Sequence, residues 1–171
     1  MEALPESRMI LLIRDPRDLV SSQLDGARQG GWMYKRKESD AWKRKALPDN
    51  DPDTFVRNRS RRYLLHAGNA KKAYEAHRGP KVLVRYENLR TNTLETMNLI
   101  YSTLGIPVRE GELARVVEKH SWENLSEDKK GEGKFYRKAS PGGWREDLTP
   151  EQAEIVEKMT APLLEEFYRP S

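Results

Sequence analysis

The sequence predicts an α/β fold built on a parallel sheet, and three observations indicate it. The segments Met9–Ile13 and Lys81–Arg85 are short and mainly apolar, as buried strands are. Residues 51–77 between them carry apolar side chains at helical spacing, which is typical of a long amphipathic helix. Gly79 and Pro80 then end this helix. A strand, a helix and a second strand in this order form a parallel unit with a crossover connection.

The first strand leads into a segment that can bind a phosphate. Because Met9–Ile13 is apolar throughout, we expect it to be covered on both faces and to end at Arg14, where open α/β sheets bind ligands. Pro16 suits the first turn of a helix, expected over residues 17–29 with free backbone N–H groups at the strand end. These groups, the Arg14 fork and the Ser22 hydroxyl would converge on an anion. The same pattern is typical of a helix cap with a surface ion pair, and the residues alone leave both interpretations open.

The segment at about 26–50 is predicted to be a long surface loop. Basic and aromatic residues alternate along it: Trp32, Tyr34, Lys35-Arg36-Lys37, Trp42 and Lys43-Arg44-Lys45. One interpretation is a solvated loop beside an acceptor pocket. The other is a surface that binds single-stranded nucleic acid, or a sulfated or carboxylated acceptor, by stacking and ion pairing. Since the net charge of +4 is modest, nucleic acid is not the expected partner.

The long helix that follows begins at a predicted cap, Asp51, with Pro52 in its first turn. Its apolar stripe consists of Phe55, Val56, Tyr63, Leu64, Ala67, Ala70 and Tyr74. His66 and His77 lie on or near this helix. Neither has a second ligand at metal-binding spacing on the same face, so we expect both to be structural or exposed. No metal site is expected.

The second half of the chain alternates helices with polar connections. Helices are predicted over 93–104, where Gly105 ends the helix, and over 109–119. Residues 126–133 are polar and form a flexible lead into the next segment. The capping box at Thr149 opens the last helix, whose core residues are Ile155, Val156, Met159, Leu163, Leu164 and Phe167.

Two of these segments resemble sulfotransferases that use 3′-phosphoadenosine-5′-phosphosulfate (PAPS). Residues 14–18, Arg-Asp-Pro-Arg-Asp, with Ser22 resemble the family's 3′-phosphate-binding segment. Residues 82–89 are similar to the family's strand and following Tyr-Glu-Asp turn, with Asn88 in place of the Asp. In this resemblance Tyr86 contacts the adenine.

Two later segments agree with the resemblance in type and order. Residues 120–125, His-Ser-Trp-Glu-Asn-Leu, are similar to the family's Ser-Phe-acidic segment, whose aromatic residue packs on adenine. Residues 135–144 resemble the family's Arg-Lys-Gly-x-x-Gly-Asp-Trp loop, which clamps the 3′-phosphate. The matching residues are Arg137, Lys138, Gly142 and Trp144, whereas Ala139 replaces a Gly and Gly143 replaces the Asp. An Ala is disfavoured at position 139 if the backbone there needs a positive φ.

The resemblance implies a three-layer α/β/α fold of the P-loop, nucleotide-kinase-like sulfotransferase class, with residues 1–171 forming a single, partial domain. It also implies the donor site. The residues expected around the 3′-phosphate are Arg14, Ser22, Arg137 and Lys138. The residues expected to frame the adenine are Tyr86, Ser121 and Trp122.

The implied reaction is transfer of a sulfuryl group from PAPS to a hydroxyl or amine of a small-molecule or glycan acceptor, which leaves adenosine 3′,5′-bisphosphate (PAP). No residue is assigned as the catalytic base. Two alternatives stay open. One is a non-catalytic module that binds an anionic partner, nucleic acid or a sulfated glycan, through residues 28–62. The other, a kinase or GTPase, needs a Gly-Lys-Ser/Thr loop that the sequence lacks.

The family's first segment has no counterpart in this sequence. Sulfotransferases begin with a strand and a Pro-Lys-Ser/Gly-Thr loop that holds the 5′-phosphosulfate, and no such loop occurs here. We therefore expect an N-terminally truncated domain, whose exposed sheet edge needs a second copy or the missing segment to cover it. The sequence has no cysteine, no membrane-spanning apolar run and no signal peptide. A cytoplasmic protein is expected, unless a lost segment carried a targeting signal.

Overall fold

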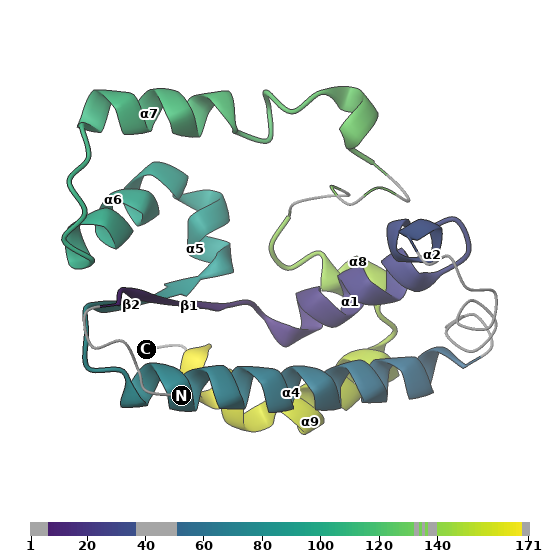
Figure 1. The fold of residues 1–171 in the computed structure, drawn as a ribbon. Helices are drawn as coiled ribbons and strands as arrows, with labels where there is room; N and C mark the ends of the chain where they lie inside the picture. The colour runs from purple at the N-terminus through teal and green to yellow at the C-terminus, as the bar shows by residue number, and fades with distance from the viewer. Residues whose placement is uncertain (1–6, 37–50, 132–133, 135, 137–139, 169–171) are drawn as a thin grey trace. The chain divides into compact units, whose positions relative to one another are not determined.

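The computed structural model describes residues 7–36, 51–131, 134, 136 and 140–168, and Figure 1 shows its elements in order along the chain. These elements are β1 (Met9–Ile13), α1 (Pro16–Ala27), α2 (Trp32–Arg36), α4 (Pro52–Ala76), β2 (Lys81–Arg85), α5 (Tyr86–Thr91), α6 (Thr93–Thr103), α7 (Glu110–Lys119), the 3-10 helix η1 (Glu127–Lys129), α8 (Trp144–Asp147) and α9 (Pro150–Phe167).

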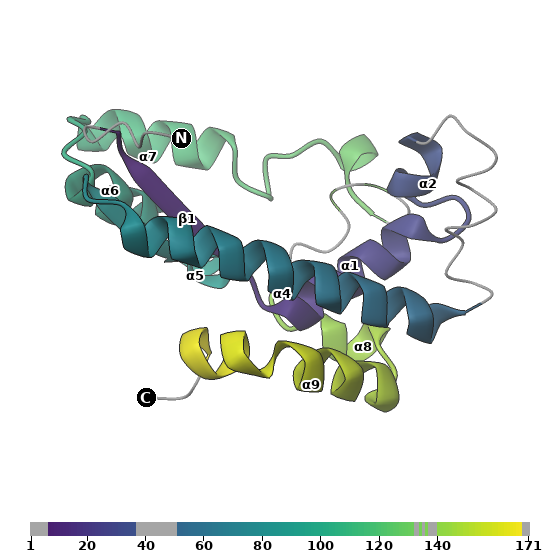
Figure 2. The ribbon, with the colours of Figure 1, turned by 60° about the horizontal axis from the view of Figure 1, so that its bottom comes forward.

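The chain divides into two compact units, which are described separately. The first consists of Met1–Arg14 and His66–Asn124, and the second of Asp15–Leu65 and Leu125–Ser171. Helix α4 contributes residues to both units and is one continuous helix (Figure 2).

The first unit contains the predicted parallel strand pair. Strands β1 and β2 run in register from Met9 opposite Lys81 to Ile13 opposite Arg85, which confirms both expected strands. Helix α6 packs on β2. The buried residues at this contact are Val82, Val84, Ile100 and Leu104. The sheet order and the long helix between its strands therefore follow from the sequence pattern.

The expectation that the first strand is covered on both faces is wrong for one face. Leu11 and Ile13 are buried, whereas Ile10 and Leu12 are each 51% exposed. Successive strand residues point to opposite faces, and residues paired across parallel strands share a face. Helix α6 thus covers this face at β2, while the neighbouring positions on β1 stay half exposed.

Hydrogen bonds fix the chain at the entrance to both strands. The ring N–H of His77 donates to the carbonyl oxygen of Ser7 at 2.8 Å, and the Arg8 Nε–H donates to that of Leu104 at 2.6 Å. The Lys81 ammonium donates to the carbonyl oxygens of Tyr74 and His77 near the end of α4. His77 is buried and has a structural role, one of the two predicted for the histidines, and His66 is exposed.

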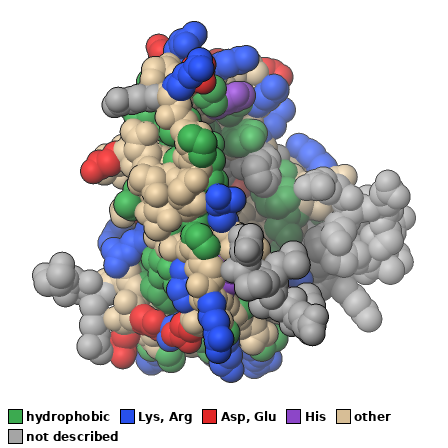
Figure 3. Space-filling view, turned by 60° about the vertical axis from the view of Figure 1, so that its left-hand side comes forward, with side chains coloured by type: hydrophobic (Ala, Val, Ile, Leu, Met, Phe, Trp, Pro, Cys, Tyr) green, Lys and Arg blue, Asp and Glu red, His purple; other side chains and the backbone are tan. Residues whose placement is uncertain are grey.

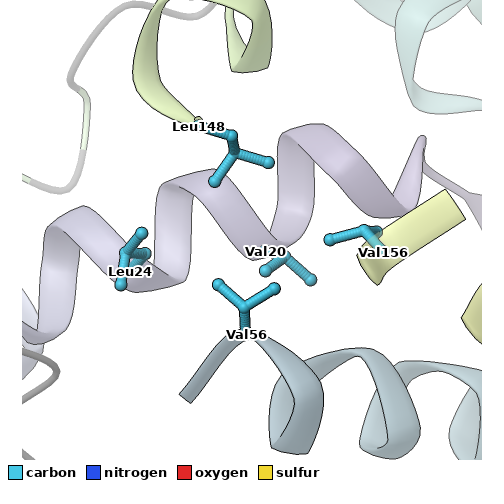
Figure 4. Close-up of a cluster of buried hydrophobic side chains, with 5 residues drawn as sticks. All are labelled: Val20, Leu24, Val56, Leu148 and Val156. Carbon is cyan, nitrogen blue, oxygen red and sulfur yellow. The ribbon is translucent and has the colours of Figure 1, made fainter. Parts of the chain in front are cut away.

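The second unit has its own hydrophobic core. Figure 4 shows its five buried side chains, which come from α1, α4, α9 and the residue before α9's cap: Val20, Leu24, Val56, Leu148 and Val156. Val56 of α4 and Val156 of α9 belong to the apolar faces that the sequence pattern predicted for these two helices. On the last helix Leu163 and Phe167 are also buried, as expected.

Both predicted helix caps are present in this unit. The Asp51 carboxylate accepts the Thr54 N–H at 3.0 Å at the start of α4. At α9 the Thr149 hydroxyl accepts the Gln152 N–H, and the Gln152 side chain accepts the Thr149 N–H, each at 3.2 Å. These reciprocal bonds confirm the capping box.

Replacing Thr149 with Ala should lower the free energy of unfolding by about 1 kcal/mol. The reason is that the Gln152 N–H, which has no acceptor within the first turn of α9, loses the Thr149 hydroxyl as its acceptor. Urea unfolding followed by circular dichroism measures this change. The matched control is Thr103→Ala at the exposed end of α6, which should change stability by less than about 0.5 kcal/mol. An equal loss in both variants would show that the cap has no special effect.

The segment predicted as a surface loop at about 26–50 is partly helical. Helix α2 (Trp32–Arg36) lies within it, and the Trp32 indole packs so close to Gly26 that an added Cβ there would lie 2.9 Å from Trp32 Cε2. The local pattern missed this contact because it depends on a glycine six residues earlier. Residues 37–50 lie outside the described part. Among the residues that are described, no helix is long and apolar enough to cross a bilayer.

Candidate functional site

The carboxyl ends of β1 and β2 place a cation on an aromatic ring. Since Ile13 pairs with Arg85, the next residues, Arg14 and Tyr86, leave the sheet at the same edge. The Arg14 guanidinium carbon lies 4.5 Å from the centroid of the Tyr86 ring, within the range of a cation–π interaction. This edge of a parallel sheet is where α/β proteins bind their ligands. The structure therefore brings these two predicted site residues together.

A second pair of this kind lies at the other end of helix α5. Arg90 follows Tyr86 by four residues, so both side chains lie on one face of the helix. The Arg90 guanidinium carbon lies 5.9 Å from the centroid of the Trp122 ring. Sequence reasoning singled out Tyr86 and Trp122 but missed Arg90. The four-residue spacing after Tyr86 is the signal that points to it.

Hydrogen bonds hold the turn that presents Ser121 and Trp122. After α7 ends, the Ser121 N–H donates to the Glu118 carbonyl oxygen at 3.1 Å, and the Asn124 side-chain amide donates to the same oxygen at 2.7 Å. The Asn124 N–H also donates to the Ser121 hydroxyl at 3.4 Å. Ser121 and Trp122 are half-buried. The turn thus has a defined shape before any ligand is bound.

The start of α1 differs from the expected row of free amides. The Asp15 carboxylate caps the helix by accepting the Arg17 N–H at 2.8 Å. The Arg17 guanidinium also pairs with Asp15 at 2.7 Å and with Glu157 at 2.8 Å. Hydrogen bonding to Asp15 is the main cause that raises the pKa of Arg17. At this amide the structure shows one of the two interpretations that the residues left open, a helix cap with an ion pair, because an Asp before a Pro is itself a strong cap. The expectation that this amide is free to bind a ligand is wrong.

Of the other residues predicted to bind the 3′-phosphate, one belongs to the second unit and two lie outside the described residues. Ser22 is half-buried on α1 of the second unit. Arg137 and Lys138 lie outside the described residues, as does Ala139. The next described residues of that loop, from Ser140 on, lead into α8. There the Gly142 and Trp144 N–H groups donate to the Asp18 carboxylate of α1.

No metal centre is evident where side chains are described: no cluster of three or more His, Asp or Glu residues suits a metal ion there. On the face drawn in Figure 3, Lys and Arg side chains lie at several separate places among hydrophobic and polar atoms. The arrangement within the first unit favours a flat aromatic ligand with a negative charge, because it offers two rings and two guanidinium groups.

Comparisons with known proteins agree on one family. The sequence model of the sulfotransferase domain matches residues 3–168. The chain is 26% identical to cytosolic sulfotransferase 16 of Arabidopsis thaliana, and the alignment covers 88% of this chain and 48% of that protein. The crystal structure of mouse sulfotransferase SULT7A1 complexed with PAP matches with a TM-score of 0.59 at 17% identity, over 92% of this chain and 58% of that chain. The chain thus spans about half the length of the Arabidopsis relative. Its fold is similar to that of the mouse structure.

Proposed function

Because this chain belongs to the sulfotransferase family, we propose that it binds PAPS and provides the donor part of a sulfotransferase site. The single observation that carries this proposal is the Arg14 guanidinium 4.5 Å above the Tyr86 ring, at the carboxyl edge of two parallel strands. A cation beside a ring suits a nucleotide that presents a phosphate and a base together. The PAP bound to the mouse neighbour supports this choice of ligand.

In this proposal four residues surround the 3′-phosphate: Arg14, Ser22, Arg137 and Lys138. Arginine suits this role because its planar fork makes two parallel hydrogen bonds to one phosphate. The Ser22 hydroxyl adds a neutral donor. Lysine contributes a compact charge that needs no fixed orientation.

Three residues frame the adenine: Tyr86, Ser121 and Trp122. The indole provides a broad stacking surface, and the turn that carries it is already held by the bonds to Glu118. Ser121 directly precedes Trp122 in the sequence. Its hydroxyl can donate a hydrogen bond to a nitrogen of the adenine. All three residues proposed to recognise the base thus belong to the first unit, in which the turn that carries Trp122 is formed without a bound ligand.

Bound PAPS supplies the sulfuryl group, which is transferred to a hydroxyl or amine of a small-molecule or glycan acceptor. PAP is the other product. The residues named here bind and orient the donor, since transfer of this kind depends mainly on positioning and charge stabilisation. The name of the Arabidopsis relative supports a cytoplasmic location.

Calorimetric titration with PAP tests this function, with adenosine 5′-monophosphate (AMP) as the matched ligand that lacks only the 3′-phosphate. Circular dichroism first establishes that the purified chain is folded. We expect PAP to bind at least about tenfold more tightly than AMP, which corresponds to one charge-assisted hydrogen bond. Equal affinity for both ligands, or no binding by the folded chain, would contradict the proposed donor site.

A further inference from the structure

A buried carboxylate on α1 holds the segment that enters α8. Asp18 is 6% exposed, and both of its oxygens accept backbone N–H groups from residues more than a hundred positions away in sequence. Oδ2 accepts from Gly142 at 2.7 Å, and Oδ1 accepts from Trp144 at 3.0 Å. Hydrogen bonds to an ionised carboxylate are among the strong ones, and burial increases the loss when they are broken.

The segment that Asp18 holds has a specific conformation. Gly142 has a φ of 84°, in the left-handed region that favours glycine, and an added Cβ would lie 2.8 Å from Arg145 Nη1. The guanidinium carbons of Arg17 and Arg145 each lie 4.5 Å from a ring centroid of Trp144. Asp18 therefore holds a turn whose backbone has a defined conformation.

Residues of the proposed donor site lie four positions away in sequence from each side of this contact. Asp18 precedes Ser22 by four residues, so the two side chains share a face of α1. Gly142 follows Lys138 by four residues. Two bonds from one carboxylate thus join the helix that carries Ser22 to the described segment that begins at Ser140, which follows Arg137 and Lys138 in the sequence.

We propose that Asp18 is a positioning residue of the donor site, which sets the affinity for the 3′-phosphate by fastening Gly142 and Trp144 to α1. This inference rests on the proposed function. In this proposal Asp18 does not bind the 3′-phosphate directly, because its carboxylate carries the same sign of charge, and its two oxygens accept the backbone N–H groups of Gly142 and Trp144. Its effect is on the phosphate ligands on either side of the contact.

The test is calorimetric binding of PAP and AMP to Asp18→Ala and Asp18→Asn. Alanine removes both acceptors, and we expect it to weaken PAP binding roughly tenfold while AMP affinity changes little. Asparagine keeps one acceptor oxygen and should restore part of the PAP affinity. The matched control is Ser21→Ala, which removes the hydrogen bond of 3.0 Å from Ser21 to Asp147 and leaves both Asp18 bonds in place. It should preserve the preference for PAP over AMP.

The outcomes separate this inference from the function on which it depends. If the wild-type chain does not prefer PAP over AMP, the proposed function fails. If the wild-type chain does prefer PAP, but folded Asp18→Ala keeps the same preference, only the role of Asp18 is overturned. An equal loss of both nucleotides, or unfolding of both variants, would assign Asp18 to general stability and would also overturn the positioning role.

Discussion

Arg14→Ala is expected to weaken the binding of PAP by roughly 100-fold or more. The guanidinium fork can make two charge-assisted hydrogen bonds to one phosphate, each worth about 1.5–3 kcal/mol, and alanine removes both. It also removes the cation that lies 4.5 Å from the Tyr86 ring centroid. Calorimetric titration measures the change, and AMP affinity should fall much less because AMP has no 3′-phosphate.

Two variants control for the loss of charge and for the loss of an arginine. Arg14→Lys keeps the charge without the fork, so its affinity for PAP should lie between those of wild type and Arg14→Ala. Arg8→Ala removes the arginine at the opposite end of β1, where its Nε–H donates to Leu104, and PAP affinity should be unchanged. Comparable losses in Arg8→Ala and Arg14→Ala would mean that Arg14 acts on the stability of the strand instead of on the phosphate.

Trp122→Ala should weaken PAP binding roughly tenfold or more, because stacking of one base on an aromatic side chain is worth about 1–3 kcal/mol. The loss should be the same for PAP and AMP, since both carry adenine. This pattern is the opposite of that expected for Arg14→Ala. Titration of both nucleotides in both variants therefore assigns the base and the phosphate to different side chains.

Trp122→Phe is the matched control for this substitution. Phenylalanine keeps a stacking face, and we expect it to retain most of the affinity. If phenylalanine and alanine have equal effects, the indole does not act as a stacking surface. If neither substitution affects binding, the adenine lies elsewhere.

Local signals in the sequence determined much of the fold. Asp51 and Thr149 are each followed by the residues that a helix cap requires, and both caps are present. Met9–Ile13 and Lys81–Arg85 were identified as strands by their length and composition, and they pair as predicted. These features depend on residues within a few positions of one another, which is why pattern and propensity suffice for them.

Contacts between distant residues could not be predicted in this way. Ile10 and Leu12 are exposed because α6 covers β2 and not the neighbouring positions on β1. The sequence of β1 alone does not show which strand a distant helix covers. Arg17 forms ion pairs with Asp15 and with Glu157. Glu157 lies 140 positions after Arg17, so the segment alone does not reveal this second partner.

The candidate site divides in the same way. The resemblance placed Arg14 and Tyr86 after two strands, and the register of those strands explains why the side chains meet. Asp18 belongs to the segment 14–18 that resembles the family, but the resemblance assigns it no role. Its bonds to Gly142 and Trp144 became evident from the structure, because they join residues 124 and 126 positions apart.

The most direct test of the central claim, that this chain recognises the 3′-phosphate of its nucleotide, is phosphorus NMR of PAP during titration with the folded protein. PAP has a separate resonance for each of its two phosphates, so the spectrum reports which one is bound. We predict that the 3′-phosphate resonance shifts more than the 5′-phosphate resonance, and that Arg14→Ala abolishes this difference. A shift of the 5′-phosphate alone, or a 3′-phosphate shift that Arg14→Ala leaves intact, would contradict the account.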